Sequence, residues 1–269
     1  MTFPSTIHQI WFDFNKGMHI GDELNEIIDA NKITIRESGI YEYKLWNLSS
    51  ANEFIEKYYP FYMSFMKKKW KFEIIKCDFF RYLLMYHYGG LYIDLDFILL
   101  KSFGDMWLNY KNYDIVLFEE WYKSANIGGN NGSSDDGNGS LHNGFLLSKA
   151  KNKFWLKMIN KLVICANTIT TTDLVWKLSG TNLLRNMYII HESDSLIIYQ
   201  PYYKVCPFKS VSKEDGGVEL LCTNKMSVPL SLQESHWRFF TLEDIHKKIK
   251  AFDESYAICV GVSSGSLWR

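Results

Sequence analysis

The chain has 269 residues, of which 47% are hydrophobic and 22% charged, an ordinary composition for a folded globular protein. Its 30 basic and 30 acidic residues cancel, so the net charge predicts neither nucleic acid nor an anionic membrane as a partner. The length suffices for one large core, and no run of 18 apolar residues predicts a membrane-spanning helix.

The cysteines and the first residues bear on the compartment. The five cysteines have no C-x-x-C spacing and are odd in number, which indicates reduced core thiols rather than disulfides or a zinc site. The first residues lack the basic-then-apolar pattern of a signal peptide. We therefore expect a soluble, cytoplasmic protein.

The N-terminal part alternates between strand and helix patterns. Strands are expected within 5–14 and 41–49, and a helix is expected over 21–33. Residues 51–70 predict helical pieces broken at Pro60. This order predicts an α/β fold with parallel strands.

The basic run KKKWK, at residues 67–71, is open to two interpretations. A run of charges most often marks a solvated helix face, which is the interpretation we favour. A role at a membrane surface is the other.

Residues 72–90 predict a buried helix, because apolar residues surround it instead of forming one stripe. Gly89 and Gly90 are expected to end it and turn the chain into a strand. Asp78 and Arg81 are three residues apart on this helix and therefore neighbours. They either form an ion pair with each other alone or line a cleft.

The next run, GGLYIDLDFILL at 89–100, is apolar except for two carboxylates. In a strand, Tyr92, Asp94 and Asp96 would share one face, with the aspartate Cα atoms about 6.5 Å apart. Burying carboxylates costs several kcal/mol per ion unless a positive charge compensates, and this run contains no Lys or Arg. Either a divalent cation completes the site or both aspartates are solvated at a strand end.

The remaining chain alternates further. The glycine-, asparagine- and serine-rich stretch 123–140 predicts a flexible loop, and residues 233–269 form an aromatic tail. Strands are expected at 113–121, 141–150 and 194–208, and helices at 151–167 and 171–180. We expect a single domain over residues 1–269, and the sequence does not determine an oligomeric state.

Seven residues of the central stretch carry a resemblance. The segment CDFFRYLLMYHYGGLYIDLD resembles the core of DXD-containing, sugar-nucleotide-dependent glycosyltransferases. The group is that of yeast initiating α-mannosyltransferases and bacterial capsular polysaccharide glycosyltransferases (glycosyltransferase family 32), and more distantly the glucosylating clostridial toxins. It implies a GT-A fold, with a Rossmann-like, mostly parallel central sheet flanked by helices. The matching residues are Asp78, Arg81, Gly89, Gly90, Tyr92, Asp94 and Asp96.

The resemblance implies roles for these residues. Asp96 would bind Mn²⁺ or Mg²⁺ directly, and Asp94 would bind ribose or sugar hydroxyls and reach the metal mainly through water. Asp78 and Arg81 would grip the donor sugar by charge-assisted hydrogen bonds. Tyr92 would pack beside the sugar or nucleotide. Asp78, Arg81, Asp94 and Asp96 are thus the expected catalytic set.

Flanking segments extend the resemblance to roughly residues 5–185. Trp11 would stack on the nucleobase, and Ile10 would offer backbone contacts to the nucleotide. Asn47 would be a polar contact to the donor. Asn143 and Gly144 would lie near the reacting centre.

The tail departs from the family pattern. Cys259 stands where the family commonly has a metal-binding histidine. Ser266 and Trp268 resemble the Ser-x-Trp of the toxins instead, which implies that Ser266 contacts metal and diphosphate and that Trp268 closes over the donor. His236 is a further candidate for the third metal ligand.

Together these features predict a metal-dependent, retaining hexosyltransferase of polysaccharide biosynthesis. Its donor would be a nucleotide-diphosphate sugar, with a UDP-sugar favoured over GDP-mannose, and its acceptor a glycan or another hydroxyl compound. One alternative is a non-catalytic protein that binds glycan or nucleotide sugar on the same fold. Another is a haloacid-dehalogenase-like phosphatase, although Ile98 stands where those enzymes have Thr or Val.

Overall fold

The computed structural model describes residues 6–14, 20–37, 42–99, 103–119, 141–191, 197–200 and 257–259. The glycine-rich stretch 123–140 lies outside the described residues, as do His236, Ser266 and Trp268. The predictions made for them stay predictions.

Strands and helices alternate through the N-terminal part, as expected. Asn47 ends β2 and caps α2, because its side chain accepts a hydrogen bond from the Ser50 N–H while Ser50 reciprocates. Pro60 then breaks the helix into a 3₁₀ turn. The elements are β1 Thr6–Ile10, α1 Asp22–Glu37, β2 Glu42–Trp46, α2 Leu48–Tyr58, the 3₁₀ turn Pro60–Tyr62 and α3 Met63–Lys67.

Helix α4, Ile74–His87, is buried around most of its circumference, as its apolar sequence predicts. It ends at Gly89 and Gly90, which have φ angles of 64° and 84°. A Cβ at Gly90 would lie 2.2 Å from the backbone oxygen of Thr6. Only glycine therefore permits the tight turn that leads from α4 into β3, Gly90–Ile93.

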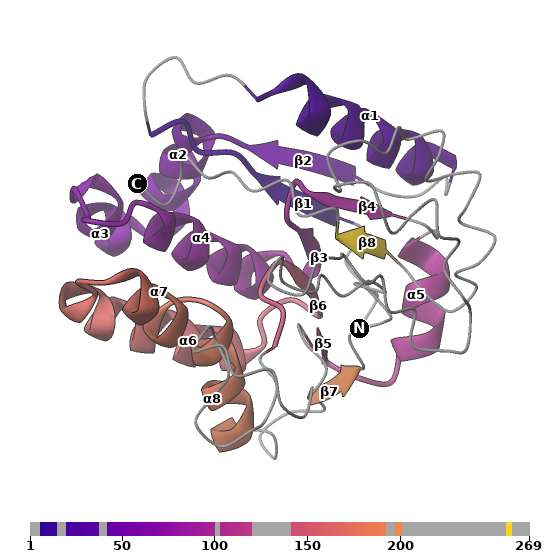
Figure 1. Ribbon diagram of the computed structural model, residues 1–269. Helices are drawn as coiled ribbons and strands as arrows, with labels where there is room; N and C mark the ends of the chain where they lie inside the picture. The colour runs from indigo at the N-terminus through magenta and orange to yellow at the C-terminus, as the bar shows by residue number, and fades with distance from the viewer. Residues whose placement is uncertain are drawn as a thin grey trace, which may run out of the picture.

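The central sheet has six strands in the order β2-β1-β3-β6-β5-β7 (Figure 1). Strand β6, Phe145–Ser148, runs antiparallel to both of its neighbours, β3 and β5, whereas the pairs β1–β2, β1–β3 and β5–β7 are parallel. The other strands are β5 Ile115–Phe118 and β7 Ile197–Gln200. This confirms the expected α/β class with a mostly parallel sheet flanked by helices.

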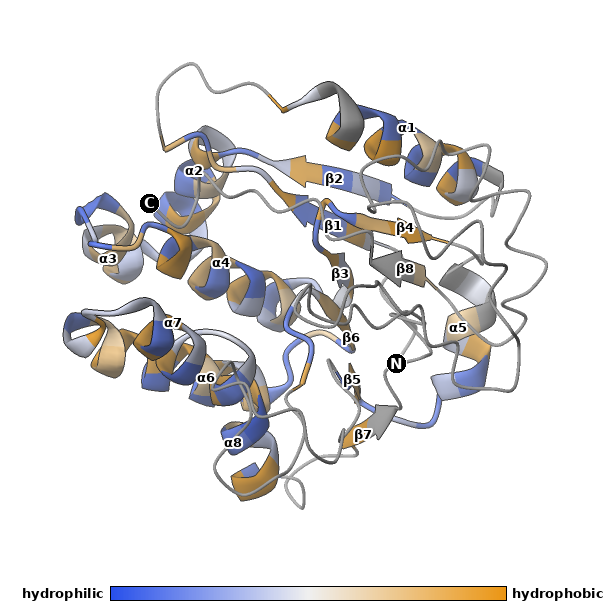
Figure 2. Cartoon of the chain, viewed as in Figure 1, coloured by the Kyte–Doolittle hydropathy of each residue, from blue (hydrophilic) through white to orange (hydrophobic). Residues whose placement is uncertain are grey.

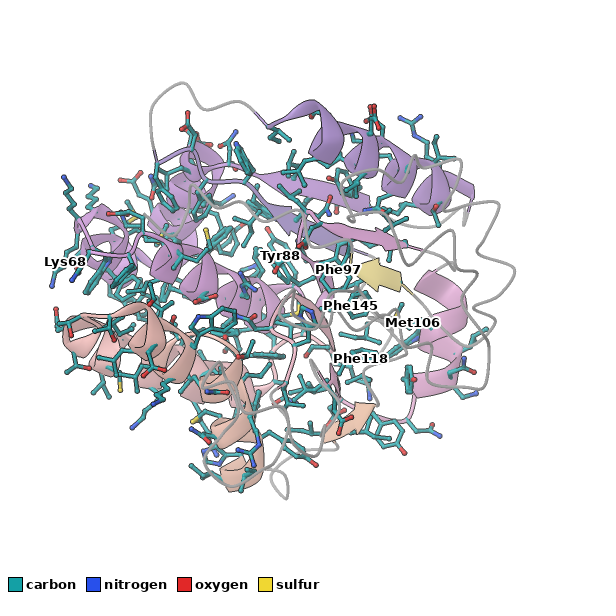
Figure 3. The ribbon with its side chains drawn as sticks, in the orientation of Figure 1. Lys68, Tyr88, Phe97, Met106, Phe118 and Phe145 are labelled. Atoms are coloured by element: carbon teal, nitrogen blue, oxygen red, sulfur yellow. The ribbon has the colours of Figure 1, made fainter. Side chains whose placement is uncertain are left out.

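Helices cover both faces of the sheet. On one face, α4 and α6, Lys153–Cys165, pack over side chains that include Tyr92 and Leu146. On the other face, α1 and α5, Phe103–Tyr110, pack over residues of alternate parity such as Leu91 and Phe145. Helix α1 carries hydrophobic and hydrophilic sides, and strand β1 combines hydrophobic residues with buried polar ones (Figure 2). Met106, Phe118 and Phe145 gather in the second core (Figure 3).

The expected strand through Tyr92, Asp94 and Asp96 is wrong. Strand β3 ends at Ile93, and Asp94 to Asp96 form a turn closed by a 3.2 Å hydrogen bond from the Phe97 N–H to the Asp94 oxygen. The chain then leaves the central sheet as β4, Phe97–Leu99, which pairs with β8, Ala257–Cys259. The two aspartates are therefore placed by a turn and not by strand alternation.

The C-terminal helices follow β6. They are α6, the 3₁₀ turn Ala166–Thr168, α7 Thr172–Leu178 and α8 Thr181–His191. In the part of the chain that the structure describes, no helix combines the length and apolar character needed to cross a bilayer.

We expect Asn31→Ala to lower the free energy of unfolding by about 2 to 4 kcal/mol, because two buried backbone groups lose their partner. The Asn31 side chain donates to the Phe97 oxygen at 2.7 Å and accepts from the Leu99 N–H at 2.8 Å, which fastens α1 to β4. Urea-induced unfolding measures the loss.

Asn25→Ala is the matched control on the same helix, since the Asn25 side chain is exposed and donates to the Ile20 oxygen at 3.0 Å. Its cost should stay below about 1 kcal/mol. Equal losses in the two variants would contradict the role of Asn31.

Candidate functional site

Four chain segments meet at the carboxyl end of β3. They are the first half of α4 with Asp78 and Arg81, the turn after β3 with Asp94, the residues preceding β6, and the α7–α8 junction at Ser179. Because a tight turn joins α4 to β3, the start of α4 and the end of β3 lie at the same edge of the sheet.

Arg81 lies between two carboxylates. Its Nη2 is 3.4 Å from Asp78 Oδ1, and its Nη1 is 3.4 Å from Asp94 Oδ1. Nη1 also donates to the backbone oxygen of Asn143 at 2.8 Å, and the guanidinium carbon lies 4.8 Å from the centre of the Tyr92 ring. Burial opposes the charged form, but Asp94, Tyr92 and Asp78 outweigh it, and the pKa of Arg81 lies well above its ordinary value.

Asp78 is buried and surrounded by donors from the protein itself. Its Oδ2 accepts from Ser179 Oγ at 2.7 Å, and its Oδ1 accepts from Asn143 Nδ2 at 3.1 Å. Burial raises the pKa of Asp78, whereas Arg81 and Ser179 lower it. Asp78 therefore orients Arg81 and Asn143, and both of its oxygens are already used within the protein.

Asp94 is the more open carboxylate of the pair, with 35% of its side chain exposed. Its Oδ1 accepts from the Tyr92 hydroxyl at 2.6 Å, and its N–H donates to the Gly144 oxygen at 2.8 Å. A Cβ at Gly144 would lie 2.4 Å from Oδ2 of Asp94. Glycine at position 144 therefore leaves the space that this oxygen occupies.

Asp96 lies in the same turn and is partly exposed. Two carboxylates two residues apart supply hard oxygen donors of the kind that Mg²⁺ and Mn²⁺ prefer, so the residues present fit such an ion. Within the described ranges no group of three His, Cys, Asp or Glu side chains could hold a metal. A third protein ligand would have to come from elsewhere, and the expected one, Ser266, lies outside the described residues.

Residues expected to bind the nucleotide lie at the end of β1. The parallel register pairs Ile7 with Leu91 and His8 with Tyr92. If this register is continued by two residues, Ile10 lies opposite Asp94. Trp11 follows, partly exposed, and its N–H donates to the Trp46 oxygen at 2.8 Å.

Asn47 has a role that the sequence analysis missed. Its side-chain oxygen accepts from the Ser50 N–H at 2.8 Å as the cap of α2. The expected contact between Asn47 and the donor stays a prediction. The asparagine directly before a helical pattern was the available signal.

Two further residues of the site were not predicted. His142 accepts a hydrogen bond from the Gly144 N–H at Nδ1, 3.2 Å away, and burial lowers its pKa to about 4. The Ser179 hydroxyl donates to Asp78, 101 residues away in the sequence. The backbone oxygen of Ser179 accepts from the Tyr82 hydroxyl at 2.8 Å. The adjacency of His142 to Asn143 was the available signal for His142.

Residues 21–114 match the family described as the glycosyltransferase sugar-binding region containing the DXD motif. This segment contains Asp78, Arg81, Asp94 and Asp96, so the resemblance drawn from these residues is confirmed for this part of the chain.

Named relatives are similar to parts of the chain. Inositol phosphoceramide mannosyltransferase 3 of Schizosaccharomyces pombe is 35% identical over 97 residues, which are 35% of this chain and 24% of the relative. Mannosyl phosphorylinositol ceramide synthase SUR1 of Saccharomyces cerevisiae is 43% identical over 56 residues, 21% of this chain and 14% of the relative. The matches thus span a quarter or less of these relatives.

Among solved structures, the PaToxG glycosyltransferase is similar with a TM-score of 0.44 and 16% identity, over 71% of this chain and 70% of the other.

We expect Arg81→Gln to lower the free energy of unfolding by about 3 to 5 kcal/mol at neutral pH, because two carboxylates lose their shared cation. Burial already raises the folded-state pKa of Asp78, and removal of Arg81 raises it further. A raised folded-state pKa means that protonation favours the folded state. The difference in unfolding free energy between the variant and the unaltered protein should therefore shrink as the pH falls through the pKa of Asp78 in the variant. Unfolding curves across acidic to neutral pH measure this difference.

Lys149→Gln is the control, since it breaks the partly exposed pair with Asp114 at 2.9 Å. Its cost should be about 1 kcal/mol or less. A loss for Arg81→Gln that does not change with pH would contradict the proposed balance of charges.

Proposed function

We propose that this chain, whose residues 21–114 match the DXD-containing sugar-binding region of glycosyltransferases, is a metal-dependent glycosyltransferase that uses a nucleotide-diphosphate sugar. The observation that carries the proposal is Arg81, held between Asp78 and Asp94 at the carboxyl end of β3. Open α/β sheets bind nucleotides at this edge.

The carboxylates need a cation before a diphosphate can approach. Asp96 and Asp94 would hold Mn²⁺ or Mg²⁺ by their oxygens, with Ser266 or His236 as a further ligand. When bound, such an ion stabilises the leaving nucleoside diphosphate as a Lewis acid. Arg81 adds a fixed positive charge that is 3.4 Å from Asp94 and cannot be deprotonated under ordinary conditions.

The protein part of the donor site would be preorganised by hydrogen bonds. Tyr92 orients Asp94 through Oδ1, which leaves Oδ2 for a ligand. Asn143 joins Arg81 and Asp78 through its backbone oxygen and its side chain. Donors and charges that are already in place need no reorganisation during reaction, which is the main source of electrostatic catalysis. Trp11, at the end of β1, would stack on the nucleobase, and Trp268 would close over the donor.

The transferred sugar is proposed to be a hexose, moved with retention of anomeric configuration to a glycan or another hydroxyl acceptor. Stacking on Trp11 would accept uracil or guanine, and a UDP-sugar is the first donor to test. Three relatives are named inositol phosphoceramide mannosyltransferases, which supports mannose as the transferred hexose and makes GDP-mannose the second donor to test.

Asp96→Asn should lower the release of nucleoside diphosphate from the accepted donor at least about 100-fold, because a metal ligand loses its charge. A panel of UDP- and GDP-sugars with Mn²⁺, and again with a chelator, identifies the donor and tests the metal requirement. Asp29→Asn is the control, since Asp29 is exposed on α1, where it pairs with Lys32 at 2.9 Å. Release that survives both the chelator and Asp96→Asn would contradict metal-dependent transfer.

Gly144→Ala should weaken donor binding about tenfold or more while the protein stays folded, because the new methyl group displaces the Asp94 carboxylate. Gly180→Ala is the matched control, as the nearest atom to its added Cβ, Asn143 Nδ2, is 3.6 Å away. Calorimetry with nucleoside diphosphate and Mn²⁺ compares the two. Equal affinities would show that Asp94 is not part of the donor site.

A further inference from the structure

The segment from the Pro60 turn to the loop before α4 contacts helix α6 and the residues that follow α6. The Tyr62 hydroxyl donates to Asn160 Oδ1 at 3.2 Å, Lys68 Nζ donates to Asn167 Oδ1, and Lys71 Nζ donates to the Thr170 oxygen at 2.8 Å. These contacts join segments about 100 residues apart. Lys68 lies at the outer end of α3, near α7 (Figure 3).

This surface is strongly basic, although the whole chain is neutral. Residues 58–72 contain no Asp or Glu, and neither do residues 151–172. The acidic residues that border these segments, Glu73 and Asp173, are paired with Lys76 and Lys177. The lysines of the two segments are Lys67, Lys68, Lys69, Lys71, Lys151, Lys153, Lys157 and Lys161.

Exposed apolar side chains belong to the same two segments. Phe61, at the turn before α3, is 67% exposed, and Ile164 of α6 is 73% exposed. Ile164 is four residues after Asn160 and three before Asn167, so it lies on the side of α6 that meets the turn and the end of α3. Phe61 and Ile164 with Lys67, Lys68, Lys69 and Lys71 are called the lysine face below.

We propose that the lysine face docks on an anionic membrane surface. Lysines attract acidic head groups, and exposed Phe and aliphatic side chains enter the boundary between head groups and acyl chains. A nucleic acid would match the charge, but an exposed Ile164 offers it neither stacking nor hydrogen bonding. The combination of charge and apolar side chains therefore favours a lipid surface.

Docking in this way would bring the membrane beside the candidate site. Helix α4 begins at Ile74, directly after the lysine face, and reaches Asp78 within about one turn. Its beginning shares an edge of the sheet with Asp94. A hydroxyl acceptor held in a membrane would then be presented near the carboxylates, although docking itself does not depend on the proposed transferase activity.

Flotation of the full chain with lipid vesicles tests the proposal without any donor. Phosphatidylcholine vesicles with phosphatidylserine should carry the protein upward at low salt, and pure phosphatidylcholine vesicles or high salt should release most of it. Lys67→Gln/Lys69→Gln should weaken the partition about thirtyfold, from roughly fivefold per lysine. Both lysines are exposed, so the variant should fold normally.

Two further variants separate the contributions. Lys32→Gln/Lys111→Gln removes the same charge from lysines elsewhere, of which Lys111 is exposed and Lys32 partly exposed, and should bind as the unaltered protein does. Phe61→Ser should weaken binding about tenfold without changing the net charge. Equal binding to both vesicle types, or equal loss in the two lysine variants, would overturn the proposal. So would binding of the lysine face to RNA in place of vesicles.

Discussion

The burial of Arg81 between Asp78 and Asp94 is the interaction on which the candidate site depends. A guanidinium and a carboxylate in the core are costly unless each satisfies the other. Here the compensation reaches further, because Asn143 and Ser179 also donate to Asp78. Four segments of the chain are thus held in one arrangement by charge, and a hydrophobic core alone would not specify it so closely.

The turn after β3 converts this buried pair into a site that a ligand can reach. Had the strand continued, Asp94 and Asp96 would have been carried along one face of the sheet. The turn instead leaves Asp94 partly exposed while the Tyr92 hydroxyl and Arg81 hold its Oδ1. One oxygen is oriented by the protein and the other faces the space that Gly144 keeps open. This division suits a carboxylate that must bind a cation and still be held in position.

The lysine face and the candidate site are adjacent. Both lie at the beginning of α4, where the chain enters the core from an exposed basic loop. The charges on the two sides of this boundary are of opposite kinds. Inside, two carboxylates flank one arginine, and outside, the lysine face combines lysines with two exposed apolar side chains. Such an arrangement would allow one end of the domain to bind lipid and an adjacent edge to bind a nucleotide sugar.

Local patterns in the sequence determined the alternation of strands and helices, the break at Pro60, the turn at Gly89 and Gly90, and the proximity of Asp78 and Arg81. Each rests on residues close in sequence, where propensity and spacing act directly. The end of β3 at Ile93 did not follow from the sequence. The tertiary structure decided it, because the chain leaves the central sheet and β4 pairs with β8, about 160 residues further along the sequence. The same holds for Ser179, which reaches Asp78 across 101 residues of sequence. Contacts between distant segments depend on how the helices pack on the sheet, and no spacing in a single sequence encodes that packing directly.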